Sequence, residues 1–212
     1  MRALILTGAF CCLLAGCAGK PSVSEHQCAV GDWETIGYRD GVNGKRSTAL
    51  LSHQDACMEH GVKPSRASYM SGWEQGAREY CEPSNAYHIG ERGWSHNNIC
   101  PSDLRSGFLS AYQDGRRLYE ARVAVASLER EIEQKSSRLD AIKSEIISAG
   151  AAQLNPVLSV EERVQLGTRV QQLLDEQARL KQELPDLEAE LAIRSRELDR
   201  LNGAVAMSDT GR

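Results

Sequence analysis

The sequence predicts an all-α protein in which a small disulfide-stapled helical module precedes a long antiparallel coiled-coil hairpin. Four cysteines and repeated pairs of small residues at helical spacing mark the first half of the chain. Leucine, isoleucine and valine recur at heptad spacing in the second half. No aromatic residue, histidine or cysteine follows Tyr119, so the two halves must bury their apolar side chains in different ways.

The composition argues against a function that depends on a basic surface. The chain has 212 residues and a formal net charge of −4, with 25 Lys and Arg against 29 Asp and Glu. We therefore expect no nucleic-acid partner, because such binding relies on neutralising phosphates with basic side chains. At 41% hydrophobic residues the chain can form a core.

The first expected element is a cleaved signal peptide, residues 1–16. Arg2 precedes an apolar run over residues 3–15. Such a run is shorter than the roughly 20 residues of a membrane-spanning helix and is typical of a secretory signal. The run ends in Leu-Ala-Gly-Cys at residues 14–17, which resembles the bacterial lipobox. That resemblance implies acyl chains, palmitate among them, on Cys17.

The next segment, residues 17–27, is expected to be a lipidated tether. Several acyl chains hold a protein on a membrane almost permanently. No aspartate follows Cys17, and resemblance to the sorting rule of bacteria with two membranes then implies the periplasmic side of the outer membrane. Exposure on the cell surface is the alternative.

Residues 28–115 are expected to form the helical module, whose four cysteines are Cys28, Cys57, Cys81 and Cys100. An even number of cysteines in a small exported domain indicates disulfides, and four cysteines allow three pairings. If residues 33–43 and 47–60 are successive antiparallel helices, the chain before Trp33 returns near Cys57. This order favours Cys28–Cys57 and Cys81–Cys100 without excluding the other pairings.

Three short units, at residues 37–41, 72–76 and 111–115, place small residues at positions i and i+4 and an aromatic residue at i+1. Positions i and i+4 share one face of a helix, so each unit forms a flat strip that another backbone can approach. We expect tight helix packing. A glycine-lined groove for a small ligand is the alternative.

Glycine and capping residues divide the module into helices. Gly61 ends one helix, and Ser65 begins another that runs to Tyr80. Residues 87–94 have no period and are expected to be an ordered loop.

Two interpretations give the module a chemical role, and both are weaker than a structural one. Two groups have a ligand spacing compatible with a helix: His53, Cys57 and His60, and also His96 and Cys100. A hydrolase would have to use the loop residues His88, Glu91 and His96. Because the spacing matches zinc patterns poorly and an oxidising compartment removes free thiols, we expect no metal and no cofactor. We also expect no catalysis, because polar residues in a glycine-rich loop are usually exposed to solvent.

The positions that carry a family resemblance are Trp33, Gly37, Asp40, Gly41, Cys57, Tyr69, Gly72, Gly76, Tyr80, Cys81, Tyr87, Gly90, Gly93 and Cys100. Their spacing resembles the bacterial lipoproteins grouped as Domain of Unknown Function 2799. The resemblance covers about residues 28–115 and implies an exported lipoprotein. It implies no activity and no functional residue.

Residues 116–203 carry two heptad seams. The first is Val125, Leu128, Ile132, Lys135, Leu139, Ile142 and Ile146, and the second is Leu166, Val170, Leu173, Gln177, Leu180, Leu184, Leu187 and Leu191. The Gly- and Pro-containing segment between them predicts a tip near residues 150–158. Ser159 and Glu162 have the spacing of a capping box, and residues 204–212 are expected to fray.

The polar seam positions predict the register of the hairpin. With Leu139 opposite Leu173, Lys135 lies opposite Gln177 and both avoid an apolar partner. A shift of one heptad would lose this match, so we expect the first register. Extra apolar positions such as Val164 leave pairing between two copies of the chain open.

The lipidated tether and the coiled-coil hairpin together predict a non-enzymatic outer-membrane lipoprotein that acts as an interaction or envelope-spacing protein. We expect a protein partner on the coiled coil, with homo-oligomers through the same heptads as an alternative. Small-ligand or metal binding by the glycine- and aromatic-rich module is a second class of function, and hydrolysis is a third.

Overall fold

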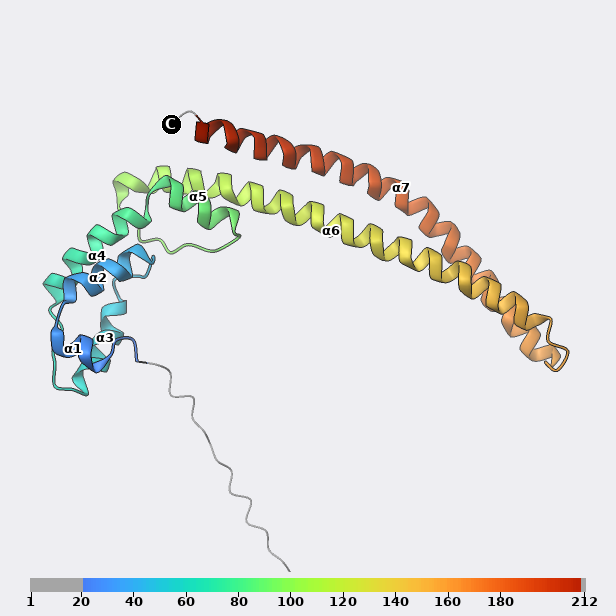
Figure 1. Ribbon diagram of the computed structural model, residues 1–212, viewed down its shortest axis with the longest axis horizontal. Helices are drawn as coiled ribbons and strands as arrows, with labels where there is room; N and C mark the ends of the chain where they lie inside the picture. The colour runs from blue at the N-terminus through green and yellow to red at the C-terminus, as the bar shows by residue number, and fades with distance from the viewer. Residues whose placement is uncertain (1–20, 211–212) are drawn as a thin grey trace, which may run out of the picture. The chain divides into compact units, whose positions relative to one another are not determined.

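The computed structural model describes residues 21–210, with side chains through residue 204, as helices joined by loops (Figure 1). No strand occurs between residues 21 and 210, which confirms the all-α fold class. The chain divides into two compact units between Glu79 and Tyr80, whereas the sequence placed its boundary after residue 115. Within the described range, no helix combines the length and apolar character that crossing a membrane requires.

The N-terminal unit, up to Glu79, is built from short helices. They are α1 (Glu25–Val30), α2 (Trp33–Val42), α3 (Ala49–Met58) and α4 (Arg66–Tyr80). Gly61, between α3 and α4, has a left-handed φ of 70°, which favours glycine. The Ser68 N–H donates to Ser65 Oγ at 3.4 Å at the start of α4. Gly61 therefore marks the end of one helix and Ser65 the start of the next, as the sequence indicated.

The apolar core of the N-terminal unit draws on all four of these helices. Its buried members are Val23, Cys28, Trp33, Ile36, Leu50, Cys57 and Tyr69. The Cys28–Cys57 disulfide joins α1 to α3, with Cα atoms 5.5 Å apart. This is the pairing that the helix order favoured. The crosslink suits a core of this size, because small domains bury too little surface to be stable without such support.

Helices α2 and α4 touch through their backbones. A Cβ atom on Gly37 would lie 2.0 Å from the Tyr69 carbonyl oxygen, and one on Gly72 would lie 1.9 Å from the Glu34 carbonyl oxygen. The second glycine of each strip is similarly confined. Since backbone atoms occupy both strips, they are packing surfaces, as expected, and no ligand groove lies between them.

The C-terminal unit begins at Tyr80. Its helices are α5 (Pro83–Glu91), α6 (Ser102–Gln153) and α7 (Val160–Thr210). The loop expected over residues 87–94 is wrong for most of its length, because α5 includes residues 87–91. Pro83 opens α5 at a position where its missing N–H has no helical partner to lose. Cys81 and Cys100 form the second disulfide, with Cα atoms 5.6 Å apart.

Helix α5 packs closely against α6 through backbone contacts at glycine. A Cβ atom on Gly90 would lie 2.2 Å from the Tyr112 carbonyl oxygen on α6. One on Gly115 would lie 2.2 Å from the Tyr87 carbonyl oxygen on α5. The close glycine packing of α2 and α4 thus recurs between α5 and α6.

Helices α6 and α7 lie side by side, run in opposite directions and are joined by a short loop (Figure 1). Helix α6 is continuous through residue 115, so the expected boundary between module and hairpin does not coincide with a helix end. Helix α7 is likewise continuous through Pro185. It extends to Thr210, where the sequence suggested a frayed tail from residue 204.

The loop between the two helices is shorter than expected. Helix α6 continues past Gly150 to Gln153, and α7 begins at Val160. The expected capping box is present: the Ser159 N–H donates to Glu162 Oε2 at 2.8 Å, and the Glu162 N–H donates to Ser159 Oγ at 3.2 Å. Local capping therefore determines where α7 starts, as the sequence indicated.

Ion pairs beside the seam show which residues face each other. One buried cluster in the seam consists of Leu139, Ile142, Leu173 and Leu180. Arg138 pairs with Glu176, and Arg169 pairs with Glu145, each at 2.8 Å. In a register shifted by one heptad, Arg138 would face Arg169, and the two like charges would repel. The observed pairs match the expected register.

The polar residues of the seams find charged or polar neighbours. Lys135, expected opposite Gln177, forms an ion pair with Glu183 at 2.6 Å and a longer one with Glu131 at 3.6 Å. The hydrogen bond to Glu183 is the main cause that raises the Lys135 pKa. Gln177 accepts a hydrogen bond from Lys181 at 3.3 Å. Both polar seam residues are thus satisfied at the edge of the seam.

Candidate functional site

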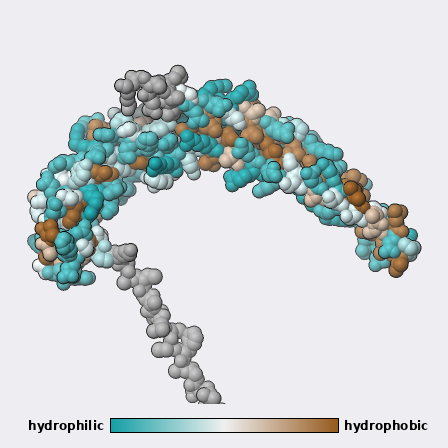
Figure 2. Space-filling view, in the orientation of Figure 1, coloured by the Kyte–Doolittle hydropathy of each residue, from teal (hydrophilic) through white to brown (hydrophobic). Residues whose placement is uncertain are grey.

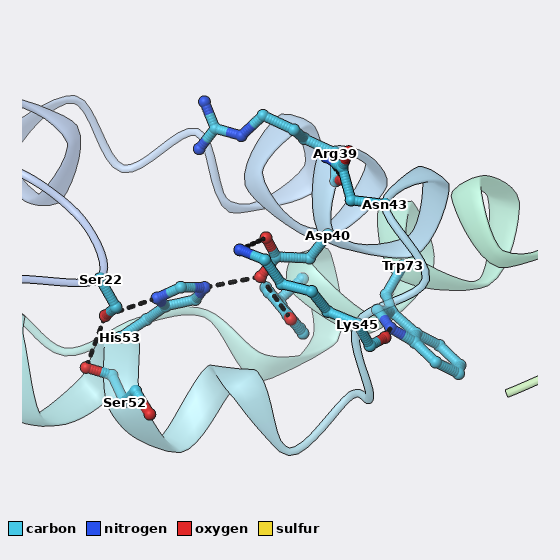
Figure 3. Close-up of polar contacts among 9 residues, drawn as sticks. Ser22, Arg39, Asp40, Asn43, Lys45, Ser52, His53 and Trp73 are labelled. Carbon is cyan, nitrogen blue, oxygen red and sulfur yellow. Dashed lines mark hydrogen bonds and ion pairs between the residues drawn. The ribbon is translucent and has the colours of Figure 1, made fainter. Parts of the chain in front are cut away.

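Two buried polar side chains lie at the centre of the N-terminal unit (Figure 3). Asp40 on α2 is 1% exposed and His53 on α3 is 2% exposed. His53 Nε2 lies 2.7 Å from Asp40 Oδ2, and His53 Nδ1 lies 2.8 Å from Ser22 Oγ. Because an ionised carboxylate only accepts hydrogen bonds, Nε2 donates to Asp40. The network connects α2, α3 and the segment before α1.

Asp40 also accepts hydrogen bonds from two further side chains. Lys45 Nζ donates at 2.8 Å and the Tyr69 hydroxyl donates at 3.0 Å. Burial raises the Asp40 pKa, but the hydrogen bonds from His53, Lys45 and Tyr69 and the Lys45 charge outweigh it and lower the pKa to about 2. Burial and the Asp40 charge raise the pKa of Tyr69. Asp40 is therefore charged and well satisfied at neutral pH.

Ser22, His53 and Asp40 are connected in the same order as a hydrolase triad, but the imidazole ring is turned the other way. In a triad Nε2 faces the serine and Nδ1 faces the aspartate. Here Nε2 faces Asp40 and Nδ1 faces Ser22. Ser22 also donates to the Ser52 carbonyl oxygen at 2.8 Å, and these contacts hold it against α3.

The network fixes the segment that leads into α1. Val23 is 3% exposed and belongs to the apolar core. Ser24 caps α1 through a capping box with Gln27. The chain from Ser22 onward therefore belongs to the folded N-terminal unit, and the expected tether over residues 17–27 is too long at its C-terminal end.

The four module cysteines are all bonded to each other. The disulfides Cys28–Cys57 and Cys81–Cys100 remove the thiolates that the alternative metal sites required. Among the residues that the structure describes, no group of three metal-ligating side chains comes together. Cys17, the expected lipidation site, lies outside the described residues.

The three residues considered for hydrolysis do not form one site. His88 and Glu91 lie on α5, where His88 Nδ1 is 2.8 Å from Glu91 Oε1. His96 packs instead against the rings of Phe108 and Tyr112, with centroids 5.2 and 4.5 Å away. His96 is thus an aromatic packing residue on another part of the C-terminal unit.

The buried Asp40–His53 pair is the feature that sequence reasoning missed. A signal was available, because Asp40 lies three residues after Gly37 and directly before Gly41. On a helix these three positions share one face, and the two glycines were expected to pack against another helix. An aspartate on that face must be buried and must find partners.

A second candidate site is the tip face of the hairpin, which we define as Ile147, Leu154, Val157, Val160 and Val164. These side chains are between 64% and 87% exposed. Figure 2 shows the hydrophobic surface that gathers at this end of the hairpin. No charged residue occurs between residues 147 and 160. Contiguous exposed apolar surface on a soluble protein marks an interaction site.

The two flanks of the seam have opposite character near the tip. The ion pairs of Arg138 with Glu176 and of Arg169 with Glu145 lie along one flank. Leu174 directly follows the seam residue Leu173, a heptad position on the other flank, and is 42% exposed. One flank thus carries ion pairs between the two helices, and Leu174 on the other flank is exposed to solvent.

The chain thus combines a glycine-packed, disulfide-bonded helical module with a long helical hairpin. Residues 32–117 match the model of a family described as protein of unknown function (DUF2799). The match supports the family resemblance of the module, from α2 to the first part of α6, and leaves the hairpin outside it. No curated protein and no solved structure matches the chain.

Proposed function

We propose that this protein is a lipid-anchored periplasmic protein of the outer membrane that makes a protein contact through its coiled-coil hairpin. Its role is non-enzymatic and concerns interaction or spacing within the envelope. Cys17 carries the lipid, and the tip face binds the partner. The lipobox at residues 14–17 supports the anchor, and the exposed tip face supports the contact.

The single observation that carries the interaction is the exposure of the tip face. Burial of a Val, Leu or Ile side chain stabilises a contact by about 1.5–3 kcal/mol. The tip face presents five such side chains, from Val164 at 64% exposure to Val157 at 87%. A partner that covers them can therefore gain enough to offset the loss of freedom on binding, which costs about 4–15 kcal/mol.

The length of the hairpin suits a contact made at a distance from its base. Helix α7 has 51 residues, which corresponds to about 75 Å at 1.5 Å per residue. The cross-hairpin ion pairs and the seam hold α6 and α7 together along the distal part of this length. Two paired helices lose less conformational freedom when the tip binds a partner than a single flexible segment would lose.

The test is photo-crosslinking in the producing cell, with the full chain and a photoreactive amino acid at Leu154 or Val160. We expect an adduct of constant mass at both positions. Val123 and Ile193 serve as matched controls, because they are exposed apolar residues of the same hairpin outside the tip face. The adduct should be absent there.

A charge-introducing variant makes the test specific. Val160→Glu with Val164→Glu places two carboxylates on exposed positions and leaves the seam untouched. The crosslink from Leu154 should then disappear, while helix content stays unchanged by circular dichroism. An adduct that persists in the variant, or that forms equally at Val123, would show that the tip face is not the contact. A product carrying two differently tagged copies would identify the partner as a second copy of the chain.

A further inference from the structure

We infer that the N-terminal unit lies directly on the lipid surface, with the outer side of α3 in the headgroup region. The inference rests on the proposed lipid anchor at Cys17 and adds a docking surface to it. Leu51 and Met58 are the apolar contacts of this surface. The lipid that we expect is zwitterionic phospholipid.

The length of chain between the anchor and the folded unit is the first argument. Ser22 is held by hydrogen bonds to His53 and to the Ser52 carbonyl oxygen, each at 2.8 Å. Val23 is buried in the core. Only the chain from Cys17 to Ser22 can therefore act as a spacer, and five residues span at most about 18 Å when fully extended. The unit cannot move far from the headgroups.

The place where this spacer joins the unit is the second argument. Ser22 contacts α3, as Figure 3 shows beside Ser52 and His53. Leu51 directly precedes Ser52 and is 60% exposed, and Met58, seven residues later on the same face, is 71% exposed. The exposed apolar residues of α3 thus begin at the site where the spacer meets the helix.

A shallow groove continues this surface beyond the end of α3. Its lining includes Met58, Val62, Lys63 and Pro64. The exposed Met58 and the partly exposed Val62 can contact acyl chains near the headgroups, and the Lys63 ammonium can pair with a lipid phosphate. Together with Leu51, the groove forms one continuous side of the N-terminal unit.

The charged residues at and after α3 determine which lipid headgroups this surface can contact. Asp55 lies on α3, and Glu59 and Lys63 follow it. This mixture of signs carries no excess of positive charge for anionic headgroups. The short spacer makes the contact effectively intramolecular, so a weak apolar interaction is enough to keep the unit docked.

The test uses the full lipidated chain in phosphatidylcholine vesicles, with a photoreactive amino acid at Met58. We expect a chain–lipid adduct by mass spectrometry, several-fold more abundant than from the same amino acid at Glu74, an exposed position on α4. Equal yields at the two positions would overturn the docking. Flotation with the vesicles is recorded in parallel and tests the anchor alone.

A double variant separates docking from anchoring. Leu51→Glu with Met58→Glu alters two exposed side chains and leaves the core intact. With the photoreactive amino acid moved to Val62, we expect this variant to float with vesicles as before and to lose most of its lipid adduct. An unchanged adduct contradicts the docking surface, whereas failure of the unaltered chain to float contradicts the lipid anchor on which the inference rests.

Discussion

Two ways of packing helices occur in this chain. In the N-terminal unit, α2 and α4 approach until the carbonyl oxygens of one helix touch the glycines of the other. In the hairpin, α6 and α7 are separated by a seam of aliphatic side chains whose buried members are Leu139, Ile142, Leu173 and Leu180. Glycine strips bury little apolar area, whereas the seam gains stability from each layer.

The difference explains which other interactions each region needs. The N-terminal unit adds a disulfide and a buried Asp40 network to its small core. The hairpin adds exposed ion pairs along one flank. A close glycine contact tolerates no added side chain, while a surface ion pair can be lost at little cost. Perturbations should therefore act on the two regions very differently.

Loss of the Asp40 carboxylate should have the largest effect. Asp40→Ala leaves the buried donors His53 and Tyr69 without their shared acceptor, and each unsatisfied buried group costs about 1–3 kcal/mol. Hydrogen exchange measured by mass spectrometry should show faster exchange in α2 and α3. Asp140→Ala, at an exposed position of α6 paired with Lys143, is the matched control and should leave exchange in α6 nearly unchanged. Equal effects of the two variants would contradict the expected difference between the N-terminal unit and the hairpin.

Removal of the first disulfide should come next. Cys28→Ala with Cys57→Ala opens a crosslink with a sequence separation of 29 residues, which lowers stability by about 3–4 kcal/mol on chain-entropy grounds. Urea unfolding should shift to lower concentration for the N-terminal unit. The hairpin contains no cysteine, so its transition should stay where it is. A parallel loss of hairpin structure would mean that the two transitions are coupled.

Two glycine substitutions should change stability in opposite directions. Gly72→Ala forces a Cβ atom to within 1.9 Å of the Glu34 carbonyl oxygen, and such overpacking costs about 1–3 kcal/mol. Gly150→Ala in α6 meets nothing within 4 Å and should stabilise the helix by about 0.5–1 kcal/mol. Thermal unfolding of both variants measures this. The prediction fails if the two changes have the same sign.

Acid should weaken the N-terminal unit over a narrow pH range. The Asp40 pKa is about 2 in the folded chain and 3.8 when the group is unperturbed. A lowered pKa contributes its full stability above the unfolded value, and this contribution is lost as the pH falls from about 4 to 2. Asp40→Asn should remove this dependence. An unchanged acid transition in the variant would assign the pH dependence to other carboxyls.

Salt should produce the smallest effect, and only in the hairpin. The Arg138–Glu176 and Arg169–Glu145 pairs are partly exposed, so raising the salt to about 1 M screens them. The hairpin melting temperature should fall slightly. The Asp40 network is buried and should respond much less. Arg138→Gln should reproduce the salt effect at low ionic strength.

Local patterns predicted most of the helices because their signals lie within one turn or one heptad. Ser159 with Glu162 is an example, since both capping hydrogen bonds depend on residues three apart. Helix α5 is the counterexample. Gly90 lowers its intrinsic helix propensity, and its position depends on backbone contact between Gly90 and α6. Ala86 and Gly90 have the i, i+4 spacing of the other strips, but that spacing does not say which helix they meet.

The sequence by itself determined the helical class, the heptad register of the hairpin and the cysteines that could pair, because periodicity and spacing encode them. Only the tertiary structure placed His53 between Ser22 and Asp40, 31 and 13 residues away. It alone decided that the glycine strips meet backbone and that the side chains of the tip face stay exposed. These features depend on which helix faces come together, and that choice is made by the packing of the whole unit.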